Sequence, residues 1–289
     1  MTTSIEKNLR IVFFIAISVF VFEIVGGILS NSLALVADSF HVLLDFSAIG
    51  ISLIAFRIAN RPHSSKFTFG FHRVEIVAAL VNGISLLIVS AFIAIEAYKR
   101  FFDPPEIDVL ILAGVAAIGL VANIAMAIML KKESKSNLNV HGSYLHVLGD
   151  LISSIGVIVG AVIIFVSNYF IVDTIVSVAI AIMIARSGIV LCRKCLHIFM
   201  EGTPVEVKVT EISKELVKLD EIIEVHDLHV WTLTSNLYAM SVHVKIKSEF
   251  VRQTNGLLKK INHLMREKFG ITHCTIQIED DQDLINPKK

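Results

Sequence analysis

Long apolar runs constrain the fold of this chain more than any other feature of its sequence. A helix needs about 20 apolar residues to cross the hydrocarbon core of a bilayer. Runs of about that length cover Ile11–Leu29, Leu33–Ile58, Val74–Tyr98, Val109–Leu130, Tyr144–Val166 and Phe170–Leu191. The chain is 54% hydrophobic with a mean hydropathy of +0.72, too apolar for a soluble globular domain. We therefore predict a multi-pass α-helical membrane protein with six transmembrane helices and both termini on one side.

The charges between the runs predict which side faces the cytoplasm. Lys and Arg concentrate in the second and fourth links and after the sixth run, at Arg57, Arg61, Lys66, Arg73, Lys131, Lys132, Lys135, Arg193 and Lys194. The first and fifth links carry neither residue type. Cytoplasmic loops of membrane proteins are enriched in Lys and Arg, so we expect both termini in the cytoplasm. The formal net charge is +0, which argues against a nucleic-acid partner.

Two His-x-x-x-Asp spacings place ionisable side chains inside these runs. His41 and Asp45 lie in the second run, and His146 and Asp150 lie in the fifth. Four residues make about one helical turn, so each pair shares a helix face. Ionisable groups at this depth are costly unless they pair, bind an ion or line water. Two nitrogens and two oxygens suit tetrahedral Zn²⁺, and the repetition favours one shared metal site over two separate packing histidines.

Other acidic residues lie in the same runs. Asp38 precedes His41 on the same stripe, where it could accept the second ring N–H of His41, line the ion pathway, or make a structural hydrogen bond. The first run contains Glu23. Asp173 lies near the outer end of the sixth run, where we expect interfacial water to solvate it.

After Met200 the chain reads as a water-soluble domain rich in Lys, Glu and Asp. Its hydrophobic periodicity predicts helices over residues 205–219 and 250–269 and strands over 226–233, 237–247 and 272–279. This αββαβ order is typical of a small two-layer α+β domain. We expect an N-terminal tail over 1–10, a transmembrane domain over 11–199, a cytosolic domain over 200–281 and a C-terminal tail over 282–289.

Histidines on the predicted strands indicate a second metal site. If Ser235-Asn236 is a two-residue turn, His243 pairs with Leu228, and His226 lies diagonally on the same face. Glu279 shares one face of the last strand with His273 by the two-residue alternation.

We expect His226, His243 and Glu279 to bind a metal, with His273 as a weaker member. His229 falls on the other face, where we expect a core histidine beside Trp231. A one-residue slip in the turn would reverse this choice.

In combination, the motifs resemble those of cation diffusion facilitators, in the zinc-transporting branch. The resemblance covers Ile11–Asp280, and five stretches carry it: Asn31-Ser-Leu-Ala-Leu-Val-Ala-Asp38 before His41-x-x-x-Asp45, Phe69-Gly-Phe-His-Arg-Val-Glu75, the second pair after Asn139, His226-Asp-Leu-His-Val-Trp-Thr-Leu233, and Thr275-Ile-Gln-Ile-Glu279. It implies a homodimer in which each protomer exports one divalent cation in exchange for protons. It also implies a ferredoxin-like, metallochaperone-like cytosolic domain that dimerises and senses metal.

The resemblance also sets expectations about substrate and location. His41 resembles the zinc-preferring variants, so zinc is the expected substrate, with Cd²⁺, Co²⁺ and Fe²⁺ as further candidates and no catalytic cofactor. Phe67 and Phe71 occupy positions where some members bind a further metal, and these side chains cannot ligate. The lack of a His-rich insertion between the fourth and fifth runs favours a prokaryotic inner or plasma membrane, with membrane lipid as the surrounding partner.

Two other functional classes are weighed against transport. An intramembrane metalloenzyme would need an open metal position and an acid or base, and the chain has no H-E-x-x-H motif. A metal-gated sensor would need a signalling motif, which the sequence lacks. We therefore expect alternating access around His41, Asp45, His146 and Asp150.

Overall fold

The computed structural model describes residues 4–62, 64–131, 138–234 and 237–281. The chain forms two compact units. The first combines residues 1–51 and 81–192, and the second combines residues 52–80 and 193–289.

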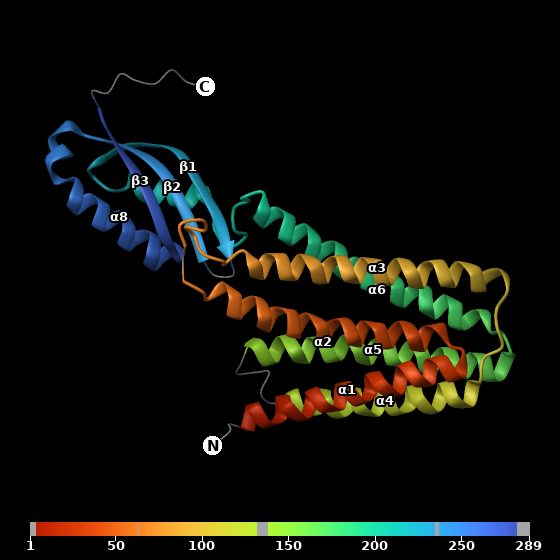
Figure 1. Cartoon of the computed structure of the whole chain (residues 1–289). Helices are drawn as coiled ribbons and strands as arrows, with labels where there is room; N and C mark the ends of the chain where they lie inside the picture. The colour runs from red at the N-terminus through yellow and green to blue at the C-terminus, as the bar shows by residue number, and fades with distance from the viewer. Residues whose placement is uncertain (1–3, 63, 132–137, 235–236, 282–289) are drawn as a thin grey trace. The chain divides into compact units, whose positions relative to one another are not determined.

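Among the described residues, six helices are long and apolar enough to cross a membrane, which confirms the predicted spans (Figure 1). They are α1 (Ser4–Ser30), α2 (Leu33–Ala59), α3 (Val74–Phe102), α4 (Val109–Lys131), α5 (Leu138–Ser167) and α6 (Ile171–Phe199). Helix α1 begins well before the predicted span, and α6 continues eight residues beyond it. No Gly or Pro interrupts either extension, so the helical backbone continues. Lys132 and Lys135 lie outside the described residues.

Within the first unit, α1 packs on α4, α4 on α5, and α2 on α5. Large apolar side chains such as Ile93, Leu112 and Ile164 are fully buried between the helices. Helices α3 and α6 approach each other closely at two glycines. A Cβ on Gly83 would lie 2.7 Å from Cys192 Sγ, and a Cβ on Gly188 would lie 3.0 Å from the Gly83 carbonyl oxygen. Side-chain packing and these close approaches hold the helices of the bundle, including α2 and α5, in place.

Two side chains from other helices hold the start of α2. Asn31 has a φ of 57°, a left-handed conformation that Asn tolerates, and Arg100 Nη1 donates to its carbonyl oxygen at 2.7 Å. The Asp173 carboxylate accepts hydrogen bonds from Ser32 Oγ at 2.5 Å and from the Leu33 N–H at 2.7 Å. Asp173 is 3% exposed, so the prediction of interfacial solvation is wrong. Hydrogen bonds from the start of α2 take the place of water around the Asp173 carboxylate, which in turn caps the N-terminus of this helix.

The C-terminal part of the second unit has the predicted αββαβ order, with one short 3-10 helix added. Its elements are α7 (Val209–Val217), β1 (Ile222–Thr234), β2 (Leu237–Ile246), η2 (Ser248–Gln253), α8 (Thr254–Phe269) and β3 (Ile271–Asp280). Strand β2 is central, antiparallel to β1 and parallel to β3. Ile212 and Leu216 of α7 and Ile261 and Met265 of α8 are fully buried against the sheet. The α+β fold class is confirmed.

The predicted register between β1 and β2 holds only beside the turn. Thr234 pairs with Leu237 as expected, but His243 pairs with His226 and not with Leu228. The Ser235-Asn236 turn itself lies outside the described residues.

Two irregularities in β1 explain the difference. One lies between Thr232 and Thr234 and the other between His226 and His229, and each adds one residue to β1. Asp227, inside the second, has a φ of 45°. One extra residue turns a strand's side chains to the other face, whereas two return them to the original face. His226 and His243 therefore share a face, as predicted, although by a different pairing.

Candidate metal centres

Helices α2 and α5 bring the predicted membrane ligands into one group. His41, Asp45, His146 and Asp150 each offer one ligand atom, and these atoms all lie within 4.8 Å of one another. We call this group the membrane tetrad. Each helix contributes one imidazole and one carboxylate because the four-residue spacing places them one turn apart.

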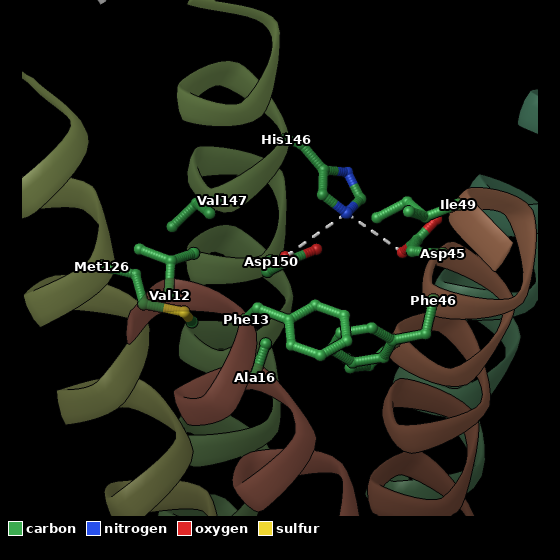
Figure 2. A pocket seen from close by; sticks show the side chains of 11 residues that line it. Val12, Phe13, Ala16, Asp45, Phe46, Ile49, Met126, His146, Val147 and Asp150 are labelled. Carbon is green, nitrogen blue, oxygen red and sulfur yellow. Dashed lines mark ion pairs between the residues drawn. The ribbon is translucent and has the colours of Figure 1, made fainter. Parts of the chain in front are cut away.

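Distances within the membrane tetrad suit a small cation. His146 Nε2 lies 3.1 Å from Asp45 Oδ2 and 3.8 Å from Asp150 Oδ2 (Figure 2). His41 Nε2 lies 3.7 Å from Asp150 Oδ1, and His41 Nδ1 lies 3.8 Å from Asp45 Oδ2. Ligands at about 2.0–2.2 Å from a tetrahedral zinc ion lie roughly 3.3–3.6 Å from one another. With one ligand atom from each residue, the four atoms lie within 4.8 Å of one another, so they could surround such an ion after shifts on the order of 1 Å.

Two donor atoms of the membrane tetrad, His41 Nδ1 and Asp150 Oδ1, are buried without a hydrogen-bond partner. A third buried donor atom, Asp45 Oδ2, lies 3.1 Å from His146 Nε2. A buried polar atom left unpaired costs about 1–3 kcal/mol, and more when it is charged. Two such atoms from two helices, beside the Asp45–His146 pair, indicate a position where a bound cation would supply the missing contacts.

A cavity of about 300 Å³ leads to the membrane tetrad (Figure 2). Apolar side chains from four helices form most of its wall: Val12, Phe13 and Ala16 of α1, Val42, Phe46 and Ile49 of α2, Met126 of α4 and Val147 of α5. Asp45, His146 and Asp150 also line it. These residues lie toward the beginning of α1 and α5, around the middle of α2 and near the end of α4. The cavity therefore lies toward the end of the bundle where α1 begins.

Buried polar side chains lie toward the opposite end of the bundle. Ser153 Oγ donates to Asp38 Oδ1 at 2.5 Å, and Asn123 Nδ2 donates to Ser154 Oγ at 2.9 Å. In the described part of the chain, no hydrogen bond joins Asp38 to the His41 ring, so the expected contact is absent. Ser153 satisfies Asp38 in place of His41. The possibility that Asp38 lines the ion pathway stays a prediction.

Glu23 of α1 lies outside both predicted metal sites. It is 2% exposed, and its Oε2 atom has no hydrogen-bond partner. A single acidic residue in an apolar run is itself a signal of function in membrane helices.

Strands β1, β2 and β3 bring a second set of predicted ligands together. His226 Nε2 lies 2.9 Å from Glu279 Oε2, and His243 Nδ1 lies 2.9 Å from Glu279 Oε1. One ligand atom from each of the three side chains lies within 4.8 Å of the others. Burial raises the pKa of Glu279, but hydrogen bonds and charge from the two histidines outweigh it and hold this pKa below its ordinary value. We call His226, His243 and Glu279 the cytosolic group.

Two other histidines do not join the cytosolic group. His273 is exposed and pairs with Ala239, six residues before Glu279 on β3, which corresponds to about 20 Å along a strand. The shared face was right, but the distance along the strand excludes His273. His229 is also exposed, so the prediction of a core histidine is wrong. The irregularity near the turn shifts it opposite Ser241 and onto the other face.

Comparisons with known proteins agree with these two parts of the chain. A family model described as the cation efflux transmembrane domain matches residues 9–200. A second, described as the cation efflux protein cytoplasmic domain, matches residues 204–281.

Several relatives are similar over most of their length. A cadmium, cobalt and zinc/H⁺-K⁺ antiporter of Bacillus velezensis is 40% identical, over 95% of this chain and 88% of that protein. The metal cation efflux system protein CzcD of Cupriavidus metallidurans is 37% identical, over 95% of this chain and 86% of that protein. The zinc transporter ZitB of Escherichia coli is 35% identical, over 89% of this chain and 82% of that protein.

Among solved structures, the metal-bound C-terminal domain of the CzcD transporter is 34% identical and covers 25% of this chain and 99% of that chain, with a TM-score of 0.24. The relatives named above are transporters or efflux proteins and not enzymes. The two family models together span most of the sequence, in the order expected from the resemblance. The chain belongs to the cation efflux family, the cation diffusion facilitators.

Proposed function

We propose that the protein exports zinc from the cytoplasm in exchange for protons, and that the membrane tetrad binds the transported ion. One observation carries this proposal: buried donor atoms of His41 and Asp150 that lack hydrogen-bond partners converge with Asp45 and His146 beside a cavity. The names of relatives support zinc and make Cd²⁺ and Co²⁺ further candidate substrates.

The position of the cavity supports an inward-open state. Lys and Arg are concentrated in links that meet the bundle at the end where α1 begins. With both termini in the cytoplasm, the cavity opens to the cytoplasm, and the buried polar side chains around Asp38 close the path to the outside. Zinc then enters from the cytoplasm and exchanges its water ligands for the membrane tetrad.

The ligand types of the membrane tetrad suit exchange between zinc and protons. Zinc binds neutral imidazole and ionised carboxylate, so loading from the cytoplasm displaces protons. Imidazole takes up and releases protons near neutral pH, so protonation from the outside competes with bound zinc. The ion and the protons thus occupy the same side chains in alternation.

We further propose that the cytosolic group binds zinc and that the cytosolic domain joins two copies of the chain. Three ligands from three strands leave a fourth position for water or another donor. The family matches at 9–200 and 204–281 support domain boundaries of 11–199 and 200–281. The family name of the second match, ZT_dimer, supports dimerisation.

Zinc flux into proteoliposomes tests the transport site. Zinc uptake driven by an acidic interior should fall to background in Asp45→Ala and Asp150→Ala, because each change removes an anionic ligand. Asp103→Ala, at an exposed position after α3, is the matched control and should keep wild-type flux. Full activity in either ligand variant would overturn the assignment.

A further inference from the structure

Helix α1 contains a buried acid outside the membrane tetrad, Glu23, which the transport scheme above leaves unused. Glu23 is 2% exposed in α1, and its Oε2 atom has no hydrogen-bond partner. An ionised carboxylate without a donor or a cation is costly inside a membrane. Glu23 therefore needs either a proton or a nearby positive charge.

The charged groups that face Glu23 are negative. Asp38 of α2 and Asp150 of α5 act on it electrostatically, and both repel a second negative charge. Helix α4, which packs on α1, carries its only described charge at Lys131, its last residue. Like-charged carboxylates in one region favour a proton on at least one of them. A proton on Glu23 would relieve this repulsion.

Helix α4 leaves room for this carboxyl group. A Cβ on Gly119 would lie 2.6 Å from Glu23 Oε1, so any larger residue there would displace the carboxyl group. One turn further along α4, Asn123 donates to Ser154 of α5. Glu23 thus lies in a buried polar layer shared by several helices, on the side of the membrane tetrad away from the cavity.

We propose that Glu23 is a proton-binding residue that loses its proton when zinc occupies the membrane tetrad. This inference rests on the proposed zinc site. A divalent cation in the membrane tetrad neutralises Asp150 and attracts a negative charge at Glu23, so ion loading favours release of the Glu23 proton. When zinc leaves, the repulsion from Asp38 and Asp150 returns and Glu23 takes up a proton again. Its position places this uptake on the outer side of the transported ion.

Proton release on zinc binding tests the inference. The background is the full-length protein with His226→Ala and His243→Ala, which remove the cytosolic group. Zinc is added to it in a weakly buffered solution that contains a pH indicator. Glu23→Gln should release about one proton fewer per bound zinc ion than this background. Glu96→Gln is the matched control, because Glu96 lies in α3 and pairs with Lys99 and Arg100, and it should release the same number as the background.

These measurements distinguish failure of the Glu23 proposal from failure of the proposed zinc site. Equal proton release from Glu23→Gln and the background would overturn the role of Glu23. If Asp150→Ala keeps full zinc binding in the same background, the membrane tetrad is not the zinc site and the transport proposal fails first.

Infrared difference spectroscopy gives a second readout. The carbonyl stretch of a protonated carboxylic acid should decrease when zinc binds, and Glu23→Gln should lack this change. If Glu23→Gln does not fold, Gly119→Ala is the second variant. Its Cβ would lie 2.6 Å from Glu23 Oε1, so it should displace the carboxyl group and shift the frequency of this infrared band. A zinc-sensitive band unchanged in both variants would contradict the assignment.

Discussion

The membrane tetrad and the cytosolic group contain the same kinds of ligands, but they differ in what those ligands do without a metal. In the cytosolic group, each Glu279 oxygen meets a histidine nitrogen at 2.9 Å, and Gln277 Nε2 donates to Glu279 Oε1 at 3.1 Å. In the membrane tetrad, His146 Nε2 lies 3.1 Å from Asp45 Oδ2, but His41 Nδ1 and Asp150 Oδ1 stay buried without a hydrogen-bond partner. A metal must break two close histidine–carboxylate contacts in the cytosolic group, whereas in the membrane tetrad it replaces one and supplies contacts that two donor atoms lack.

Exposure does not explain this difference, because the side chains of the cytosolic group are 22–36% exposed and those of the membrane tetrad are 13–43% exposed. The walls differ instead: apolar side chains from four helices surround the tetrad, where polar atoms without a partner are costly. The incompletely paired tetrad suits a site that must change its occupant during transport, whereas the paired cytosolic group suits slow regulation or structural binding.

The largest expected effect is the difference in zinc flux and zinc content between a variant of the membrane tetrad and a variant of the cytosolic group. Asp150→Ala should reduce zinc flux to background, because it removes an anionic ligand of the transported ion. Glu279→Ala should change flux by less than about 10-fold while losing one bound zinc ion per protomer. Flux into proteoliposomes and metal content of the purified full chain measure the two effects. Loss of flux in Glu279→Ala equal to that in Asp150→Ala would remove the distinction.

A smaller effect tests whether the irregularity in β1 builds the cytosolic group. Asp227 has a φ of 45°, which costs a β-branched residue roughly 1–2 kcal/mol or more. In the Asp150→Ala background, Asp227→Val should weaken zinc binding by about 10-fold as the strand shifts to relieve this strain. Asp227→Gly, which tolerates the conformation, should bind as tightly as the parent. Equal affinity in the valine variant would show that the histidines do not depend on this backbone geometry.

The smallest effect concerns the solvent-exposed ion pairs of the cytosolic domain. Lys218 at 2.6 Å and Lys268 at 2.8 Å lower the pKa of Glu215 from 4.5 to about 2. This lowered pKa stabilises the folded domain above pH 4.5, and the contribution is lost as the pH falls toward about 2.

Thermal unfolding followed by fluorescence of Trp231, the single tryptophan, reports on this domain. Glu215→Gln should be slightly less stable than wild type at neutral pH, and the difference should vanish near pH 2 and shrink in high salt. A difference that persists at low pH would show that Glu215 stabilises the domain by packing and not by charge. Glu267→Gln, on α8, controls for the loss of one carboxylate.

Local spacing was enough to predict the membrane tetrad. Helical periodicity relates His41 to Asp45 and His146 to Asp150 without knowledge of the rest of the chain. Apolar length alone marked the six spans that the structure contains among its described residues. These predictions hold because a helix in a bilayer must satisfy its own backbone, which leaves few alternatives.

The cytosolic group shows where local spacing fails. The register of two strands depends on every residue between them, and two extra residues in β1 changed the partner of His243 and the face of His229. His273 has the right face but the wrong position along β3. Neither an irregularity nor a distance along a strand can be read from side-chain alternation.

The sequence by itself determined the six spans, the αββαβ order and the four residues of the membrane tetrad, because each depends on apolar length or a repeat within one element. Only the tertiary structure decided that Asp173 caps α2, that Ser153 rather than His41 binds Asp38, and that the Oε2 atom of Glu23 is buried without a hydrogen-bond partner. Each of these depends on which helices lie side by side. A side chain's partners across helices are set by packing, and packing is not encoded in the spacing of any single helix.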